Sequence, residues 1–79
     1  MGLFARLKLS FKNHEFKRAS ERKAYHENLV KFWTERAQNN PDSNEAKEKL
    51  AFHEQRFAMY SSIAEELEFD IKKLERNEN

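Results

Sequence analysis

The chain contains no cysteine, one glycine and one proline among its 79 residues. Without cysteine it has no disulfide framework and no thiolate metal site. Phosphate-binding loops, nucleophile elbows and tight β-hairpin turns depend on glycine, and the single glycine is Gly2. These absences argue against several enzyme folds and against β-hairpins, and they leave helices as the expected elements.

Long apolar runs are also missing. Arg6 and Lys8 interrupt the opening stretch, which argues against a secretion signal or a membrane span there. Arg6 also occupies the position where a myristoylation signal requires Ser or Thr. We therefore expect a cytoplasmic location. Charged residues make up 37% of the chain and balance to a net charge of +1, so net charge predicts no class of partner.

Apolar residues recur at heptad spacing in two parts of the chain. Between residues 44 and 76, apolar side chains recur at alternating steps of four and three, with one histidine among them: Ala46, Leu50, His53, Phe57, Tyr60, Ala64, Leu67, Ile71 and Leu74. This seam predicts an amphipathic helix of about 30 residues. A helix of this kind needs a partner to bury its apolar stripe.

A second seam indicates that partner, a helix over residues 13–39. Its members are Leu9, Lys12, Phe16, Ala19, Lys23, His26, Val30, Trp33 and Ala37. Pro41 disfavours helix at Asn40, and Asp42 with Glu45 has the form of a capping box for the next helix. A turn over residues 39–43 predicts an antiparallel hairpin. The seams then pair in seven layers, from Ala37 opposite Ala46 to Phe16 opposite Leu67.

A lone hairpin leaves further apolar side chains on one of its sides. They precede seam positions on both helices, and we call them the second apolar face: Tyr25, Leu29, Phe32, Phe52, Met59 and Ile63. The opposite side is polar, with Glu27, Lys31, Thr34, Glu54, Ser61 and Glu65. Exposed apolar patches of this size mark interaction sites. We predict that the second apolar face binds a partner protein, and that the chain forms a C2 homodimer, a four-helix bundle, through it.

Residues 1–12 predict a short, separate amphipathic helix, with a bend near Ser10–Asn13. Its apolar residues are Leu3, Phe4, Leu7 and Phe11. Three roles are open for this N-terminal anchor. It could fold over the second apolar face as core, dock on a partner, or bind a membrane surface with its cations facing anionic lipid.

The first helix also carries a basic stretch, made up of Lys8, Lys12, Lys17, Arg18, Arg22 and Lys23. Cations on one face would bind phosphates, so nucleic-acid binding is the rival hypothesis. The alternative is that Lys17, Arg18, Arg22 and Lys23 pair across the hairpin with Glu65, Glu66, Glu68 and Asp70.

No catalytic or metal-binding pattern stands out. His14, His26 and His53 lack the Glu-x-x-His spacing of carboxylate metal bundles, and the serines have no evident His–Asp companions. We expect an all-α fold, a polar tail over residues 77–79, no cofactor and no enzymatic activity. The leading hypothesis is a small interaction protein, an inhibitor, adaptor or assembly factor of the kind found among phage and plasmid accessory proteins.

Overall fold

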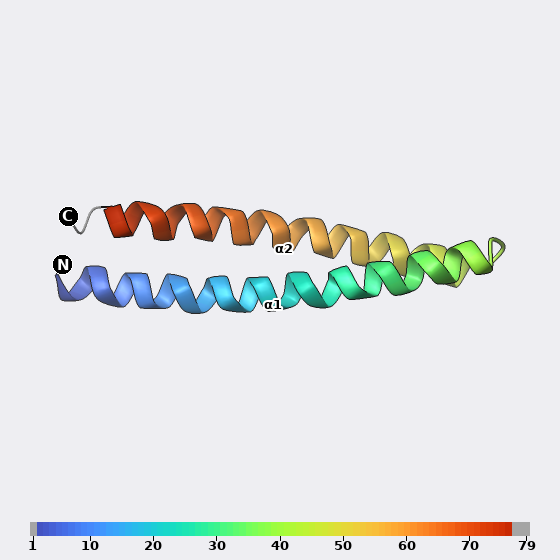
Figure 1. Ribbon diagram of the computed structural model, residues 1–79, viewed down its shortest axis with the longest axis horizontal. Helices are drawn as coiled ribbons and strands as arrows, with labels where there is room; N and C mark the ends of the chain where they lie inside the picture. The colour runs from blue at the N-terminus through green and yellow to red at the C-terminus, as the bar shows by residue number, and fades with distance from the viewer. Residues whose placement is uncertain (1, 77–79) are drawn as a thin grey trace.

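Two long helices pack side by side in opposite directions (Figure 1). The computed structural model describes residues 2–76, with α1 spanning Leu3–Asn39 and α2 spanning Asn44–Arg76. The molecule is a rod of 58 × 14 × 13 Å, with the turn at one end and both the start of α1 and the end of α2 at the other. The predicted all-α hairpin is confirmed. The predicted tail over residues 77–79 lies outside the described residues.

α1 is one uninterrupted helix, so the expected bend near Ser10–Asn13 and the separate N-terminal helix are absent. No Gly or Pro occurs between Leu3 and Asn39 to break it. The seam also extends through the expected bend: Leu9 is half-buried, and Lys12 Nζ donates a hydrogen bond to Asp70 Oδ2 of α2 at 3.3 Å. These contacts with α2 outweigh the weak tendency of Ser10 and Asn13 to cap a new helix.

α1 ends at Asn39, two residues before Pro41. The residue before a proline avoids helical geometry, and Asn40 has φ −134° and ψ 73°. Its N–H still donates to the carbonyl of Arg36 at 2.9 Å. The N–H of Ser43 then donates to the Asn40 carbonyl at 3.0 Å, which closes a four-residue turn with Pro41 in its second position.

The cap of α2 lies one residue later than expected. The Oγ of Ser43 accepts a hydrogen bond from the N–H of Ala46 at 3.2 Å. Asp42 lies within the turn, so its side chain is too early in the chain to form the predicted capping box. Ser43 satisfies one of the free N–H groups in the first turn of α2.

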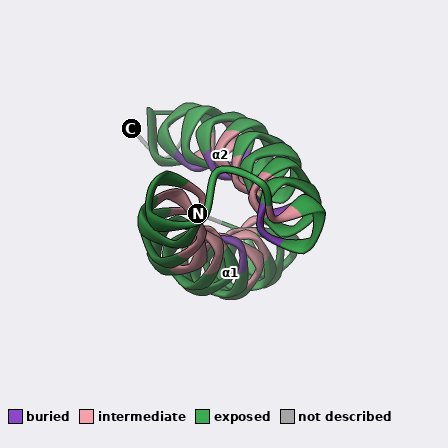
Figure 2. Ribbon diagram, turned by 90° about the vertical axis from the view of Figure 1, so that its right-hand side faces the viewer, coloured by how far each residue is buried: buried purple, intermediate pink, exposed green. Residues whose placement is uncertain are grey.

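Both seams face the contact between the helices. Every seam residue is buried or half-buried. Figure 2 shows the buried and intermediate parts of the ribbon where the two helices face each other, with exposed parts on the outside. Ala19 packs with Ala64 and Leu67, and Phe16 lies against this cluster. Ala19 and Ala64 form one of the seven layers that the alignment predicts.

The core between the helices is thin. The buried apolar residues are Ala19, Ala46, Ala64, Leu67 and Ile71, and none of the described side chains is fully shielded from solvent. Alanine buries little area, so this core contributes little of the roughly 25 cal/mol per Å² that apolar burial supplies. Small scaffolds with such cores gain stability from further association.

Candidate protein-interaction surface

The second apolar face is exposed along one side of the hairpin. Tyr25 is 61% exposed, Phe32 46% and Phe52 45%, and Met59 and Ile63 are nearly as open. Leu29 is half-buried. Both helices contribute to this face, so its shape depends on the hairpin being formed.

The ring of His26 contacts aromatic residues of this face on both helices. Tyr25 and Phe52 both lie edge-on to it, with ring centroids 5.1 Å and 6.3 Å away. Tyr25 is on α1 and Phe52 on α2, and the sequence separates them by most of a helix. The structure therefore brings together two of the predicted partner-binding residues through a third residue that the prediction left out.

Three arginines lie over aromatic rings at or beside this face. Arg36 lies 5.3 Å from the ring centre of Phe32, Arg56 lies 5.1 Å from Phe52, and Arg22 lies 5.7 Å from Tyr60. Such contacts combine cation–π attraction with cover of apolar surface by the arginine stem. The prediction missed Arg36 and Arg56, although each follows its aromatic residue by four positions, a spacing that brings side chains together on a helix.

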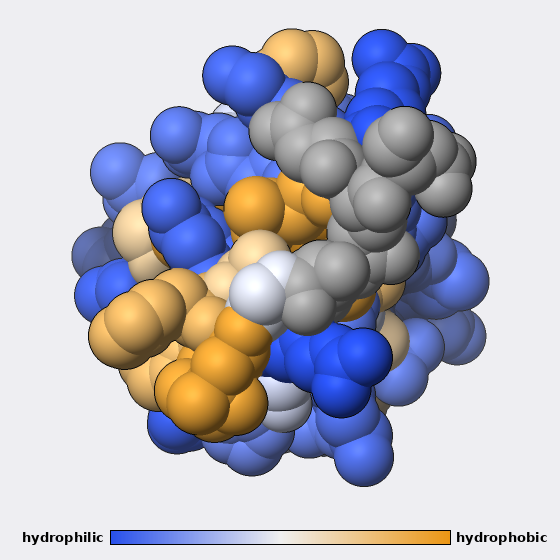
Figure 3. All heavy atoms as spheres, turned by 90° about the vertical axis from the view of Figure 1, so that its left-hand side faces the viewer, coloured by the Kyte–Doolittle hydropathy of each residue, from blue (hydrophilic) through white to orange (hydrophobic). Residues whose placement is uncertain are grey.

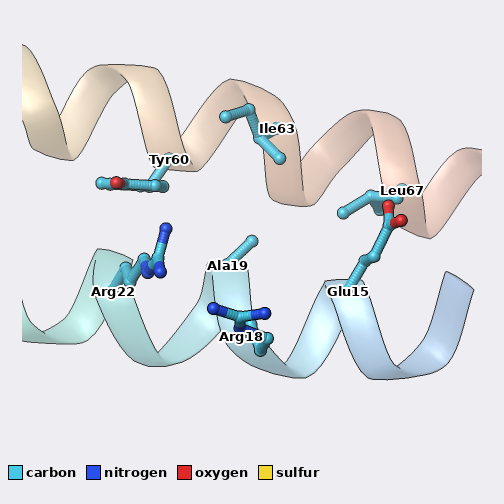
Figure 4. A pocket seen from close by; sticks show the side chains of 7 residues that line it. All are labelled: Glu15, Arg18, Ala19, Arg22, Tyr60, Ile63 and Leu67. Carbon is cyan, nitrogen blue, oxygen red and sulfur yellow. The ribbon is translucent and has the colours of Figure 1, made fainter. Parts of the chain in front are cut away.

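A shallow groove of about 240 Å³ runs between the helices beside Ile63. Figure 4 shows Arg22 reaching from α1 toward the ring of Tyr60, and Glu15 extending toward Leu67 of α2. Its lining residues are Glu15, Arg18, Ala19, Arg22, Tyr60, Ile63 and Leu67. Small-molecule sites usually enclose about 300–1,000 Å³ and most of their ligand. This groove is open, and it suits side chains of a packed partner better than a small ligand.

His26 and His53 form a pair across the hairpin. Their Nδ1 atoms are 2.9 Å apart, so one ring donates its N–H and the other accepts with its lone pair. His26 also stacks on Tyr60 at 5.6 Å. The alignment places His26 opposite Phe57, whereas it lies between His53 and Tyr60, because a side chain at a helix contact fits between residues of the facing helix. Burial, the charge of His53 and the charge of Arg56 lower the pKa of His26.

The N-terminal anchor residues are exposed and do not cover the second apolar face. Leu3, Phe4, Leu7 and Phe11 are 58–87% exposed, and Figure 3 shows apolar surface gathered on one side of the open end of the hairpin. Of the three roles left open for these residues, the structure does not show the first, in which they fold over the second apolar face as core. A continuous α1 holds Leu3 roughly 30 Å from Tyr25 at 1.5 Å per residue, so the segment cannot fold back.

The basic stretch is not paired as expected. Among the described residues, the only ion pair between the helices joins Lys12 to Asp70. Lys23 instead lies with its Nζ 5.8 Å from the ring centre of Phe57. Glu65, Glu66 and Glu68 are exposed off the seam, and Glu68 pairs with Lys72 on its own helix.

The six cations do not form a single face either. Lys12 and Lys23 belong to the half-buried seam. Lys17 follows seam residue Phe16, which places it on the polar side, whereas Lys8, Arg18 and Arg22 precede seam positions and lie on the side of the second apolar face. Lys8 and Lys12 line one groove together with Lys73 of α2. Lys17 lies on the other side of α1, so the six cations do not form one continuous surface.

The part of the chain that the structure describes holds neither a cluster of candidate metal ligands nor a helix that could span a membrane. Over residues 2–76, no three side chains of His, Cys, Asp or Glu come together as metal ligands. Neither helix has an apolar stretch long enough to cross a lipid bilayer. Comparison of the chain with protein-family models, curated proteins and solved structures finds no match.

Proposed function

We propose that this chain is a small, non-enzymatic interaction module that binds another protein chain through the second apolar face. The observation that carries the proposal is the exposure of large apolar side chains on one side of a hairpin whose own core is thin. A partner that covered Tyr25, Phe32 and Phe52 would add the apolar burial that the hairpin lacks. Inhibitor, adaptor and assembly-factor roles all fit binding of this kind.

The chemistry of the face supports a protein rather than a small molecule. Interfaces between proteins are rich in aromatic residues and arginine, with apolar anchors surrounded by polar groups. Tyr25, Phe32 and Phe52 would be the anchors, and Arg36 and Arg56 the surrounding cations. The groove beside Ile63 is shallow and open, which suits a flat or helical partner.

Self-association is one case of this binding, in which the partner is a second copy of the chain and the product is a four-helix bundle. Two hairpins that shared the second apolar face would form a two-layer core of the usual kind. The cytoplasmic location remains part of the same hypothesis, because nothing in it requires a membrane or an extracellular partner.

The proposal predicts that Phe32→Asp abolishes partner binding while the hairpin stays folded. A carboxylate in an apolar interface is costly when it is desolvated, whereas on the exposed free hairpin it is tolerated. Affinity capture from the native host should recover a partner with the unaltered chain and lose it with Phe32→Asp. Phe69→Asp is the matched control, because Phe69 is 67% exposed and lies outside the second apolar face. An identical capture profile for all three chains would show that the second apolar face does not bind the partner.

A further inference from the structure

One column of α1 has two aromatic residues on each side of a central arginine. Its members follow one another at steps of seven: Phe4, Phe11, Arg18, Tyr25 and Phe32. The last four directly precede seam positions, and Phe4 precedes Ala5, which is half-buried. Residues seven apart lie on the same side of a helix that packs through a heptad seam. All five are exposed. The column therefore joins the N-terminal aromatic residues to the second apolar face as one stripe, with Arg18 at its centre.

We infer that the stripe is covered by a second copy of this chain, placed antiparallel with its two-fold axis at Arg18. In that arrangement α1 lies on α1 of the second copy. Phe4 of each copy meets Phe32 of the other, and Phe11 meets Tyr25. The two Arg18 side chains meet at the axis, where the Glu15 carboxylate of each copy lies about one helical turn away. The inference rests on the proposed function and names the occupant of the face. It also explains the exposure of the N-terminal aromatic residues. They cannot reach the second apolar face of their own chain because α1 is continuous, but they can cover that face on the second copy.

Charge complementarity supports the antiparallel direction on α1. Glu15 and Arg22 precede seam positions on either side of Arg18 and line the same groove. Neither forms an ion pair with the described residues of its own chain. The two-fold axis places Glu15 of one copy against Arg22 of the other, and it does so twice. Complementary charges of this kind fix direction and register.

The same axis fits α2. Ile63 and Arg18 line one groove, so they lie at nearly the same height along the rod. Arg56 and Asp70 precede seam positions seven residues before and seven after Ile63. Antiparallel copies therefore place Arg56 of one chain against Asp70 of the other. The Lys12–Asp70 pair holds that carboxylate in the contact between the helices, on the edge nearest to the second copy.

A second copy running in the same direction is the alternative arrangement. At matched heights α1 of one copy would then lie on α2 of the other, so Glu15 of one copy could not meet Arg22 of the other.

Distances between spin labels distinguish the two directions. The chain has no cysteine, so single labels attach cleanly at Lys17→Cys, Ala24→Cys and Lys31→Cys, all exposed on the polar side. The antiparallel copies separate paired labels along the rod by about 3, 18 and 39 Å respectively, at 1.5 Å per residue. Distances that rise in this order support the inference, and equal distances at the three sites overturn it.

A charge exchange tests the contacts themselves. Glu15→Arg and Arg22→Glu should each weaken the dimer about tenfold, because each change breaks two symmetric pairs. The double variant should restore the affinity, and Lys17→Glu on the polar side should leave it unchanged. A double variant no tighter than the singles overturns the register. A third outcome separates this inference from the proposed function. If the chain is monomeric, and Phe32→Asp loses a partner captured from the host, then the second copy is not the occupant of the face, but the proposed function still holds.

Discussion

At the scale of single residues, the middle of the seam is held by polar contacts instead of apolar packing. His26 and His53 share one hydrogen bond, and His26 stacks on Tyr60. Lys23 and Arg56 lie nearby over the rings of Phe57 and Phe52. The hydrogen bond needs one Nδ1 without a proton, so it cannot persist when both rings are charged. The surrounding cations oppose that charge as well.

This arrangement predicts a stability that depends on pH. The folded chain lowers the pKa of His26, so the unfolded chain binds a proton more readily. The free energy of unfolding should therefore be full above about pH 6.5 and fall as the pH drops through the lowered pKa of His26. If both rings become charged, the hydrogen bond between them is lost as well, at a cost of about 1 kcal/mol. Urea unfolding between pH 5.5 and 8, at one chain concentration, measures it.

His26→Leu should flatten this pH dependence. His14→Leu is the control, because His14 is exposed on α1 away from the pair and should leave the dependence in place. A slope that survives in His26→Leu would show that other groups cause it.

At the scale of elements, spacing alone predicts the two seams, the turn and the antiparallel pairing. Heptad periodicity is a strong signal over 30 residues, and Pro41 marks the turn clearly. The continuity of α1 through Ser10 was not predictable from local signals, because Ser and Asn act as caps only where tertiary contacts do not favour a continuing helix. The cap at Ser43 in place of Asp42 is a one-residue shift, the usual uncertainty of helix ends.

Side-chain partners were predicted less well than elements. The alignment places His26 opposite Phe57, but a side chain at a helix contact has several neighbours, and the direction of each decides which one it meets. For the candidate site, the spacing indicated which residues share a side. It did not indicate that Arg36 and Arg56 lie over aromatic rings or that the N-terminal residues stay exposed.

The continuity of α1 predicts the effect of proline at two positions. Ser10→Pro should destabilise the chain by about 3 kcal/mol, because proline inside a helix removes a hydrogen bond and clashes with the preceding turn. Leu3→Pro should cost little, because Leu3 is the first residue of α1 and proline is accepted there. Chemical unfolding followed by circular dichroism gives both values. Equal, small effects would indicate that residues 1–12 form a separate segment after all.

At the scale of the whole molecule, the hairpin resembles half of a larger bundle. Half of the buried residues in its seams are alanines, while most of its large aromatic residues lie on the outside. A rod only two helices wide cannot shield both of its apolar surfaces. Pairing of two rods would cover the second apolar face and the aromatic stripe of α1 together.

The mass of the chain in solution tests this claim most directly. Sedimentation equilibrium at micromolar concentration should give twice the chain mass of 9.5 kDa for the unaltered protein and for Phe69→Asp. Phe32→Asp should give a single chain mass and retain its helical circular dichroism, because Phe32 lies in the shared face and outside the seams of the hairpin. A 9.5 kDa species for the unaltered protein, or a dimer that persists in Phe32→Asp, would contradict pairing through the second apolar face.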